Sequence, residues 1–213
     1  MTRDPVTAGP DDSLTHALRL TREHRIRHLP VVDANGTLAG IVSDRDIRLA
    51  MPSPFSVADE ERVDFLERTP VAAIMTREVI TTSAGEPVED AAKLIHRHRI
   101  GALPVVDAAG RLEGILTETD LLDAFVQIVG GTQAASRVEV ALADRPGELA
   151  RAVAILAEHA VNIVTVLVSP VPFEGKKTVI FRIATIDPRE ALDALEAAGF
   201  RVGWPSLEED FRA

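Results

Sequence analysis

The sequence has no cysteine, no tyrosine and only 4% aromatic residues among its 213 positions. The absence of cysteine excludes disulfides, thiolate metal sites and a cysteine nucleophile, and it fits a reducing cytoplasm. No apolar stretch approaches the roughly 20 residues of a membrane span, and the opening residues MTRDPVTAGPDD lack the apolar segment of a signal peptide. We therefore expect a cytoplasmic protein without a membrane partner.

Recognisable catalytic motifs are also lacking. The sequence holds no phosphate-binding G-x-x-x-x-G-K-[ST], no G-x-G-x-x-G after a strand, no H-E-x-x-H and no G-x-S-x-G. His96 and His98 lie two positions apart late in an expected helix, where they point to different faces, and no carboxylate cluster completes a metal site. We expect no enzyme, no catalytic residues, no metal site and no catalytic cofactor.

The chain is acidic, with a formal net charge of −10. Its basic residues are interleaved with acidic ones, so the sequence shows no basic stripe that would attract a nucleic-acid backbone. We therefore expect no nucleic-acid partner. Hydrophobic residues make up 46% of the chain, which is ordinary for a globular protein with a sizeable core.

The strongest positive signal is an internal repeat. When Met1 is placed on Met75, HRIRHLPVVDANGTLAGIVSDRD lies on HRIGALPVVDAAGRLEGILTETD, and no gap is needed as far as Ala50 on Ala124. Roughly twenty of the fifty aligned pairs are identical, far above chance for unrelated stretches. The chain therefore uses one supersecondary unit twice.

Each copy predicts the order β-α-β-β-α, because apolar residues at helical spacing alternate with short apolar strands and glycine turns. In the first copy we expect strands at residues 6–7, 29–33 and 38–42, a helix beginning at Asp12-Ser13, a turn at Gly36 and a final helix. In the second copy the strands are expected at residues 79–81, from Leu103 and at 112–116, with a helix beginning near Pro87 and a turn at Gly110.

The pattern LPVVD, a turn and then G-x-I-[VL]-[ST]-x-x-D resembles the CBS domain, and two such copies resemble a Bateman module. The resemblance implies CBS domains at residues 1–50 and 71–128, related by a pseudo-twofold axis. Residues 71–74 (VAAI) form a lead-in to the second copy that the first copy lacks at Met1. Either the true N-terminus lies upstream, or the first domain has a trimmed edge.

Residues 51–70 link the copies, and their prolines frame an expected helix that carries Val63 and Leu66. We interpret this linker as a spacer, with a partner-binding helix as the alternative.

From Ser136 onward the pattern predicts β-α-β-β-α-β, a ferredoxin-like arrangement. The expected strands are residues 137–142, 161–166, 177–184 and 200–202. The first helix is expected to bury one face, which carries Leu149, Ala152, Val153 and Leu156. The second helix is expected to begin at Asp187-Pro188 and to end before Gly199. The fold class is thus mixed α+β and α/β.

The motif D-R-P-G-E-L followed by V-N-I resembles the ACT domain, which we place at residues 136–213. The resemblance implies small-ligand binding, usually of amino acids, at the loop before the first helix. Ala160-Val161 replaces the glycine that the family carries before its asparagine, so this departure weakens the ligand prediction. The order CBS–CBS–ACT is similar to the acetoin-utilisation B-type proteins. The candidate ligand residues are Asp144, Arg145, Pro146, Gly147, Glu148, Leu149 and Asn162, and the alternative is that Asp144 only caps the helix.

Ser43-x-x-Asp46 and Thr117-x-x-Asp120 lie where a strand runs into a helix. An ionised aspartate can accept both ribose hydroxyls, while helix N–H groups suit phosphate oxygens. The alternative is that these residues only cap their helices. The nucleotide site that the CBS resemblance implies consists of Val6, Arg27, His28, Pro30, Ser43, Asp46, Ile80, Leu103, Pro104, Thr117 and Asp120.

Arg27-His28 in the first copy correspond to Gly101-Ala102 in the second. Basic side chains at this place can neutralise a polyphosphate, so we expect phosphate affinity to depend mainly on the first copy. The alternative is two basic residues on an ordinary surface loop.

The predicted function is a non-catalytic regulatory sensor that binds an adenine nucleotide at the CBS pair. A dimerising scaffold with vestigial sites is the alternative. We expect a homodimer or higher homo-oligomer, because four CBS domains can complete a disc and a four-stranded ACT sheet leaves edges to cover. The regulated protein is unknown. Because only residues 130–133 separate the modules, we also expect the ACT domain to tune nucleotide binding.

Overall fold

The computed structural model describes residues 1–53, 55, 58–130 and 134–207. The chain divides into two compact units, Met1–Leu122 and Asp123–Ala213. Most of the predicted hinge at residues 130–133 lies outside the described residues.

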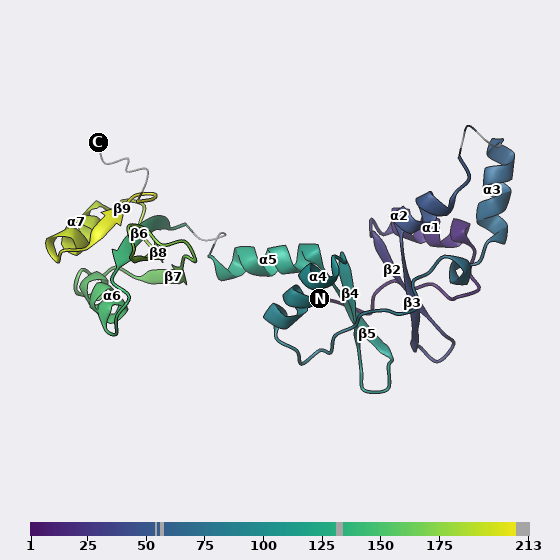
Figure 1. Ribbon diagram of the computed structural model, residues 1–213, viewed down its shortest axis with the longest axis horizontal. Coiled ribbons are helices and arrows are strands. Elements are labelled where there is room, and N and C mark those ends of the chain that lie inside the picture. The colour runs from purple at the N-terminus through teal and green to yellow at the C-terminus, as the bar shows by residue number, and fades with distance from the viewer. Residues whose placement is uncertain (54, 56–57, 131–133, 208–213) are drawn as a thin grey trace. The chain divides into compact units, whose positions relative to one another are not determined.

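Both repeat copies fold as a helix, a β-hairpin and a second helix (Figure 1). In the first copy these are α1 (Leu14–Glu23), β2 (His28–Val32), β3 (Leu38–Ser43) and α2 (Asp44–Ala50). In the second copy they are α4 (Val88–His98), β4 (Ala102–Val106), β5 (Leu112–Thr117) and α5 (Glu118–Ile128). Gly36 and Gly110 close the hairpin turns with φ of 78° and 79°, as the sequence predicts.

The strand predicted at the start of each copy is wrong as stated. Residues 6–7 and 79–81 form no strand; each segment instead makes one parallel bridge just beyond it, Ala8 to Val31 and Thr82 to Val105. The segment meets the hairpin edge at one residue only, so no consecutive ladder forms. A short strand lies earlier, as β1 (Thr2–Arg3).

The two copies exchange their leading residues. Strand β1 pairs antiparallel with β5 of the second copy, where Thr2 lies opposite Ile115. In the equivalent bridge, Thr76 lies opposite Ile41. The hairpin tips also meet, because Leu38 N donates to Gly110 O at 3.0 Å and Leu112 N donates to Gly36 O at 3.1 Å. These matched pairings give the module its pseudo-twofold symmetry.

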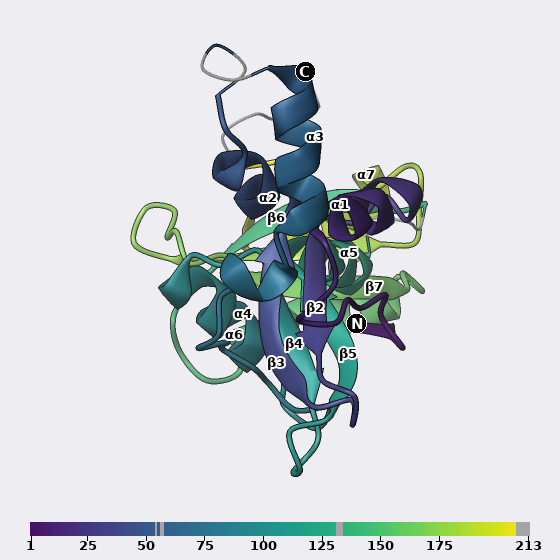
Figure 2. The same ribbon diagram turned by 90° about the vertical axis from the view of Figure 1, so that its right-hand side faces the viewer.

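The linker contributes to the first copy's core. Helix α3 (Asp59–Arg68) packs against α1, and a single 3₁₀ turn follows at Val71–Ala73 (Figure 2). Val71 is fully buried and Leu66 nearly so, among residues of the first copy such as Leu14 and Leu29. Val63 is 54% exposed. The predicted linker helix is therefore present, and the lead-in to the second copy closes the core of the first.

The second unit has the β-α-β-β-α-β order that the sequence predicts. Its elements are β6 (Ser136–Leu142), α6 (Glu148–Glu158), β7 (Ile163–Val168), β8 (Lys177–Ile183), α7 (Arg189–Ala197) and β9 (Arg201–Gly203). The antiparallel sheet has the order β7-β8-β6-β9, and residues of both helices share one core with it, around Phe181 and Leu192. The mixed fold class is thus confirmed.

Two local predictions in this unit need correction. Leu149 is 42% exposed rather than buried. Helix α7 begins at Arg189 with Pro188 as its N-cap residue, not Asp187. The Asp187 carboxylate still accepts a hydrogen bond from Arg189 N at 3.1 Å, so it satisfies a first-turn donor. Gly199 follows the C-cap with φ of 86°, as predicted.

Candidate functional site

Each hairpin ends in a reciprocal helix cap. The Ser43 hydroxyl accepts from Asp46 N at 3.1 Å, while Ser43 N and Oγ donate to Asp46 Oδ2 at 2.9 and 2.7 Å. Thr117 and Asp120 repeat the arrangement at 3.2, 2.8 and 2.7 Å. The capping role is therefore real in both copies. It uses Oδ2 of each aspartate and leaves Oδ1 outside the cap.

A cavity of about 380 Å³ adjoins Asp120, and we call it the Asp120 cavity. Its lining combines the opening residues and the Arg25–His28 segment of the first copy with the cap of the second copy. The residues are Thr2, Asp4, Pro5, Val6, Arg25, Ile26, Arg27, His28, Ile115, Thr117, Thr119 and Asp120.

A second cavity of about 290 Å³ adjoins Asp46, and we call it the Asp46 cavity. It has the same construction with the copies exchanged, and His28 also reaches it. The lining residues are His28, Ile41, Ser43, Asp46, Thr76, Glu78, Val79, Ile80, Arg99, Ile100, Gly101 and Ala102. Both volumes are of the order expected for small-ligand sites, about 300 Å³ and upward.

The exchange of leading residues explains why both cavities are composite. Strand β1 brings the first copy's opening segment to β5, and so to the Thr117–Asp120 cap. The basic residue Arg27 therefore lies in the cavity of Asp120, not in that of Asp46. The sequence places Arg27 and Asp46 in one copy, and only the tertiary pairing separates them.

Three predicted site residues do not line either cavity. Leu103 is fully buried, and Pro30 and Pro104 are buried in their strands. The carbonyl of Pro30 accepts from Ala8 N at 3.1 Å, and that of Pro104 accepts from Thr82 N at 3.0 Å. These residues hold the leading segments against the hairpins. Val6 and Ile80 do line the cavities.

Several lining residues were not predicted. Arg25 and Arg99 are identical in the aligned repeat, and both have left-handed backbones with φ of 54° and 53°. Asp4 and Glu78 form another matched pair, one acid in each cavity. The sequence does carry a sign of Arg25 and Arg99, because the tripeptide H-R-I is retained in both copies just before each β-hairpin.

His28 is half-buried between charged neighbours. Burial is the main cause that lowers its pKa from the ordinary 6.5, and the Arg27 guanidinium adds to this. The carboxylates of Asp44, Glu118 and Asp46 act in the opposite direction. The imidazole is therefore mostly neutral near pH 7 and can take up a proton when an anion arrives.

The loop before α6 excludes the helix-capping role that was the alternative for Asp144. Asp144 does not cap the helix; it forms an ion pair with Lys177 at 2.7 Å, and the N-cap position belongs to Gly147 with φ of 93°. No side chain caps α6. Glu148 accepts hydrogen bonds from Arg145 and Arg151. The hydrogen bonds from Arg145 are the largest cause that lowers the pKa of Glu148 below its ordinary range.

The remaining predicted residues of the second unit do not converge on a described cavity. Asn162 and Pro146 are exposed. A cavity of about 210 Å³ in this unit is lined by residues from elsewhere, among them Glu139, Phe173 and Thr178. Within the described part of the chain, no group of three or more His, Asp or Glu residues is placed to hold a metal ion. None of the described helices is long and apolar enough to cross a bilayer.

Comparisons with known proteins agree with this architecture. The CBS domain model matches residues 1–53 and 71–127, and the ACT domain model matches residues 136–200. A CBS domain-containing protein of Dictyostelium discoideum is 40% identical over 130 residues, which is 61% of this chain and 90% of that protein. Inosine-5′-monophosphate dehydrogenase of Mycobacterium leprae is 38% identical over 122 residues, 57% of this chain but only 21% of the enzyme.

Two solved structures that are similar to the chain carry adenosyl ligands. The CBS pair of protein MJ0100, in complex with 5′-methylthioadenosine and S-adenosyl-L-methionine, is 33% identical, with a TM-score of 0.50 over 62% of this chain and 94% of that one. Protein CBSX2 in complex with AMP is 34% identical, with a TM-score of 0.51 over 61% and 94%. A Vibrio cholerae protein assigned to acetoin utilization is 32% identical, with a TM-score of 0.52 over 62% and 90%.

The chain belongs to the CBS-domain family, as a CBS pair followed by an ACT domain. Its resemblance to an acetoin-utilisation B-type protein is confirmed at the level of the CBS pair.

Proposed function

We propose that the chain is a non-catalytic sensor that binds adenosyl ligands, such as AMP or ATP, in the Asp120 and Asp46 cavities. The observation that carries the proposal is the doubled, composite cavity. Each one places an aspartate, already fixed by its cap, beside a helix N-terminus and apolar side chains such as Val6 or Ile80. The Oδ1 atom outside the cap suits a ribose hydroxyl, and an apolar wall suits an adenine ring.

Related structures support this assignment, because MJ0100 and CBSX2 hold 5′-methylthioadenosine, S-adenosyl-L-methionine or AMP on a similar CBS pair. The match to inosine-5′-monophosphate dehydrogenase covers only about a fifth of that enzyme. The catalytic activity of that enzyme is therefore not carried over to this chain, and the proposed sensor is non-catalytic.

The test is calorimetry of the full chain with AMP and adenosine, using Asp120→Asn and Asp46→Asn as single-cavity variants. Asparagine retains a carbonyl oxygen for the helix cap but loses the carboxylate. We expect two ligand molecules per wild-type chain and about one per variant, with the altered cavity weakened about tenfold or more. Unchanged stoichiometry and affinity in the double variant would show that these aspartates do not bind the ligand.

A scaffold with vestigial sites is the competing function. It is favoured by the caps themselves, which give Ser43, Asp46, Thr117 and Asp120 a purely structural role. The sensor explains more, because a cap alone does not require a cavity beside it in both copies. Absence of binding by every adenosyl ligand, in a chain that dimerises, would favour the scaffold.

We further propose that the loop at residues 144–149 binds a small carboxylate such as an amino acid. The N-terminus of α6 has no side-chain cap, so its N–H groups can serve an anion, and Arg145 lies beside it with 67% of its side chain exposed. A thermal-shift screen of amino acids, with Arg145→Ala as the control, tests this part separately.

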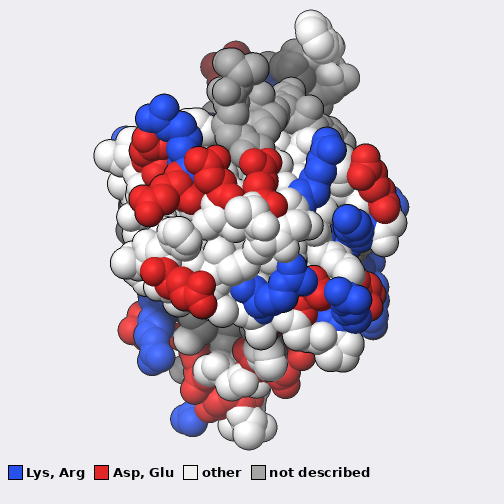
Figure 3. All heavy atoms as spheres, turned by 90° about the vertical axis from the view of Figure 1, so that its left-hand side faces the viewer, with Lys and Arg blue, Asp and Glu red and all other residues white. Residues whose placement is uncertain are grey.

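The proposed setting is a cytoplasmic homodimer that signals to a still unknown protein. On the face shown in Figure 3, basic side chains are interspersed with acidic ones, so this face presents no basic stripe to a nucleic-acid backbone.

A further inference from the structure

His28 is the one residue that the Asp120 and Asp46 cavities share among their described lining residues. Every other member of either lining belongs to one cavity only. The pseudo-twofold symmetry assigns Ala102 to the same position in the second copy, and a methyl group cannot serve a ligand electrostatically. The symmetric design of two cavities therefore contains one asymmetric, shared side chain.

Gly101 provides the space for this arrangement. A Cβ atom at Gly101 would lie 2.7 Å from His28 Cε1 and 2.8 Å from His28 Nε2, which is too close for either contact. The imidazole edge therefore lies directly against the backbone of the Asp46 cavity. Gly101 corresponds to Arg27 in the repeat, so the second copy has lost a basic residue at the place where the first copy's histidine enters.

The basic groups are divided unequally between the cavities. The Asp120 cavity has Arg25 and Arg27 of its own, whereas the Asp46 cavity has only Arg99 in addition to the shared histidine. The groups that act on His28 are one guanidinium, Arg27, and three carboxylates, Asp44, Asp46 and Glu118. A phosphate that approaches His28 is attracted by one guanidinium and repelled by three carboxylates. Without a further cation it therefore meets mainly negative charge around this residue.

We propose that the two cavities share the His28 imidazole, so that a phosphorylated adenosyl ligand in one cavity weakens the binding of a second phosphorylated ligand in the other. Unphosphorylated adenosyl ligands do not use the imidazole and bind the two cavities independently. The inference rests on the proposed function, and it names the phosphate as the group that makes the cavities interact. The physical basis is that the imidazole carries at most one positive charge, and only one N–H donor while it is neutral, so a phosphate that binds it on one side leaves less for a phosphate on the other.

Direct repulsion between two bound phosphates would also produce weaker second binding. The two causes are separable, because repulsion remains when His28 is removed and the sharing does not. If His28 contacts the ligand in both cavities, its removal must weaken AMP binding in each cavity, even when the other cavity has been inactivated by mutation.

The experiment is calorimetry of the full chain with AMP and with adenosine, before and after His28→Ala. Wild type is expected to bind the second AMP about tenfold more weakly than the first, beyond the statistical factor, and to show no such difference for adenosine. His28→Ala is expected to lower the AMP ratio, and the difference that remains is the part that Arg25 and Arg27 of the Asp120 cavity contribute. An unchanged AMP ratio in His28→Ala would overturn the proposal.

Single-cavity variants make the test sharper. In both Asp46→Asn and Asp120→Asn backgrounds, adding His28→Ala is expected to weaken AMP about tenfold and leave adenosine unchanged. A loss in only one background would assign His28 to one cavity and refute sharing. Gly101→Ala is the matched variant that keeps the histidine but displaces its ring; it is expected to weaken AMP at the Asp46 cavity alone. His28→Gln replaces His28→Ala where the latter reduces folding, as judged by circular dichroism.

Failure of the inference and failure of the proposed function give different results. If wild type binds neither AMP nor adenosine, the proposed function fails. If it binds both, and the ratio of the two AMP constants does not depend on His28, only the sharing fails.

Discussion

At the scale of single residues, the two cavities differ in their basic side chains rather than in their capped aspartates. Arg27 is exposed and lines the Asp120 cavity together with Arg25, whereas its counterpart Gly101 leaves the Asp46 cavity with Arg99 as its one lining arginine among the described residues. A guanidinium at this place can pair with a phosphate and contributes nothing specific to adenosine.

Replacing Arg27 by Ala is expected to weaken AMP and ATP binding at the Asp120 cavity about tenfold, because one charge-assisted contact is lost, while adenosine affinity is unchanged. Calorimetry in the Asp46→Asn background isolates that cavity. Arg22→Ala, which removes an exposed arginine from α1 outside both cavities, is the matched control. Equal losses for AMP and adenosine would remove the phosphate role from Arg27.

The histidine between the cavities also links stability to pH. Its folded pKa lies below the ordinary 6.5, so the unfolded chain binds more protons in the interval between the two values. The contribution of neutral His28 to the free energy of unfolding is complete above pH 6.5. It is lost as the pH falls through the pKa that His28 has in the folded protein. We expect wild type to lose thermal stability between about pH 7 and pH 5 more steeply than His28→Gln. Parallel melting curves for the two proteins over this range would contradict the expectation.

At the scale of elements, the 3₁₀ turn at Val71–Ala73 connects the copies and also closes a core. Leu14 N donates to Thr69 O at 3.0 Å, and Val71 N donates to Asp12 O at 2.8 Å, so the segment is fixed to the start of α1 by its backbone. The Val71 side chain then fills the first copy's core. A spacer that merely joined two domains would not need either feature.

Val71→Ala is therefore expected to lower the free energy of unfolding by about 2 kcal/mol, from lost burial and a residual cavity. The matched control is Val63→Ala on α3, where the same change at a side chain that is 54% exposed is expected to cost less than about 0.5 kcal/mol. Urea unfolding followed by circular dichroism measures both. Equal effects would mean that the turn is only a tether.

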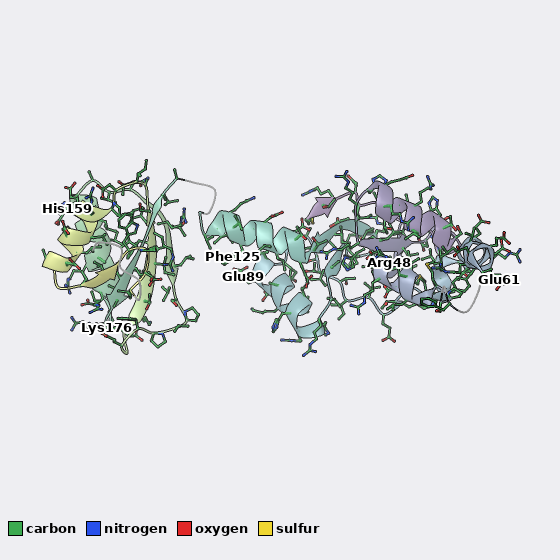
Figure 4. The ribbon with its side chains drawn as sticks, turned by 90° about the horizontal axis from the view of Figure 1, so that it is seen from above. Arg48, Glu61, Glu89, Phe125, His159 and Lys176 are labelled. Atoms are coloured by element: carbon green, nitrogen blue, oxygen red, sulfur yellow. The ribbon has the colours of Figure 1, made fainter. Side chains whose placement is uncertain are left out.

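At the scale of the whole molecule, helix α5 leaves an apolar surface uncovered. Leu122, Phe125 and Ile128 are 61%, 58% and 59% exposed, and Leu49 on the equivalent helix α2 is 73% exposed; Phe125 is labelled in Figure 4. Exposed apolar groups on one helix are typical of association surfaces. We expect light scattering at micromolar concentration to give at least twice the 23.0 kDa of one chain. Phe125→Glu is expected to reduce this mass, and a monomeric wild type would contradict the prediction.

The ACT domain is expected to tune the nucleotide sites through α5. This helix begins directly after the Thr117 cap, and within the second unit Thr165 Oγ1 of β7 donates to the carbonyl of Ile128 at 3.3 Å. Two coupled sites change each other's affinity by equal factors, typically about 5- to 150-fold. Nucleotide titration of the full chain and of a chain ending at Gly130 measures the effect. Identical affinity and oligomeric state in both would show that the domains act independently.

The repeat and its local chemistry are determined by the sequence itself. Periodicity, turn glycines and the Ser/Thr-x-x-Asp spacing depend on residues close together in the chain, so the order of elements and both helix caps were predictable. The glycine of the G-x-I motif also has a tertiary role that the motif alone does not reveal. In the structure, a Cβ at Gly40 would lie 2.9 Å from Thr76 O, and one at Gly114 would lie 2.8 Å from Thr2 O, because the other copy's leading residues cross there.

Tertiary structure decided which residues share a cavity. The exchange of leading segments joins Arg27 with Asp120, separates it from Asp46 and moves Val71 into the first copy's core. Such contacts link residues far apart in sequence, and no local pattern encodes which of two similar copies supplies the partner. The shared position of His28 is decided in the same way, because it requires the small Gly101 of the opposite copy to lie against the imidazole.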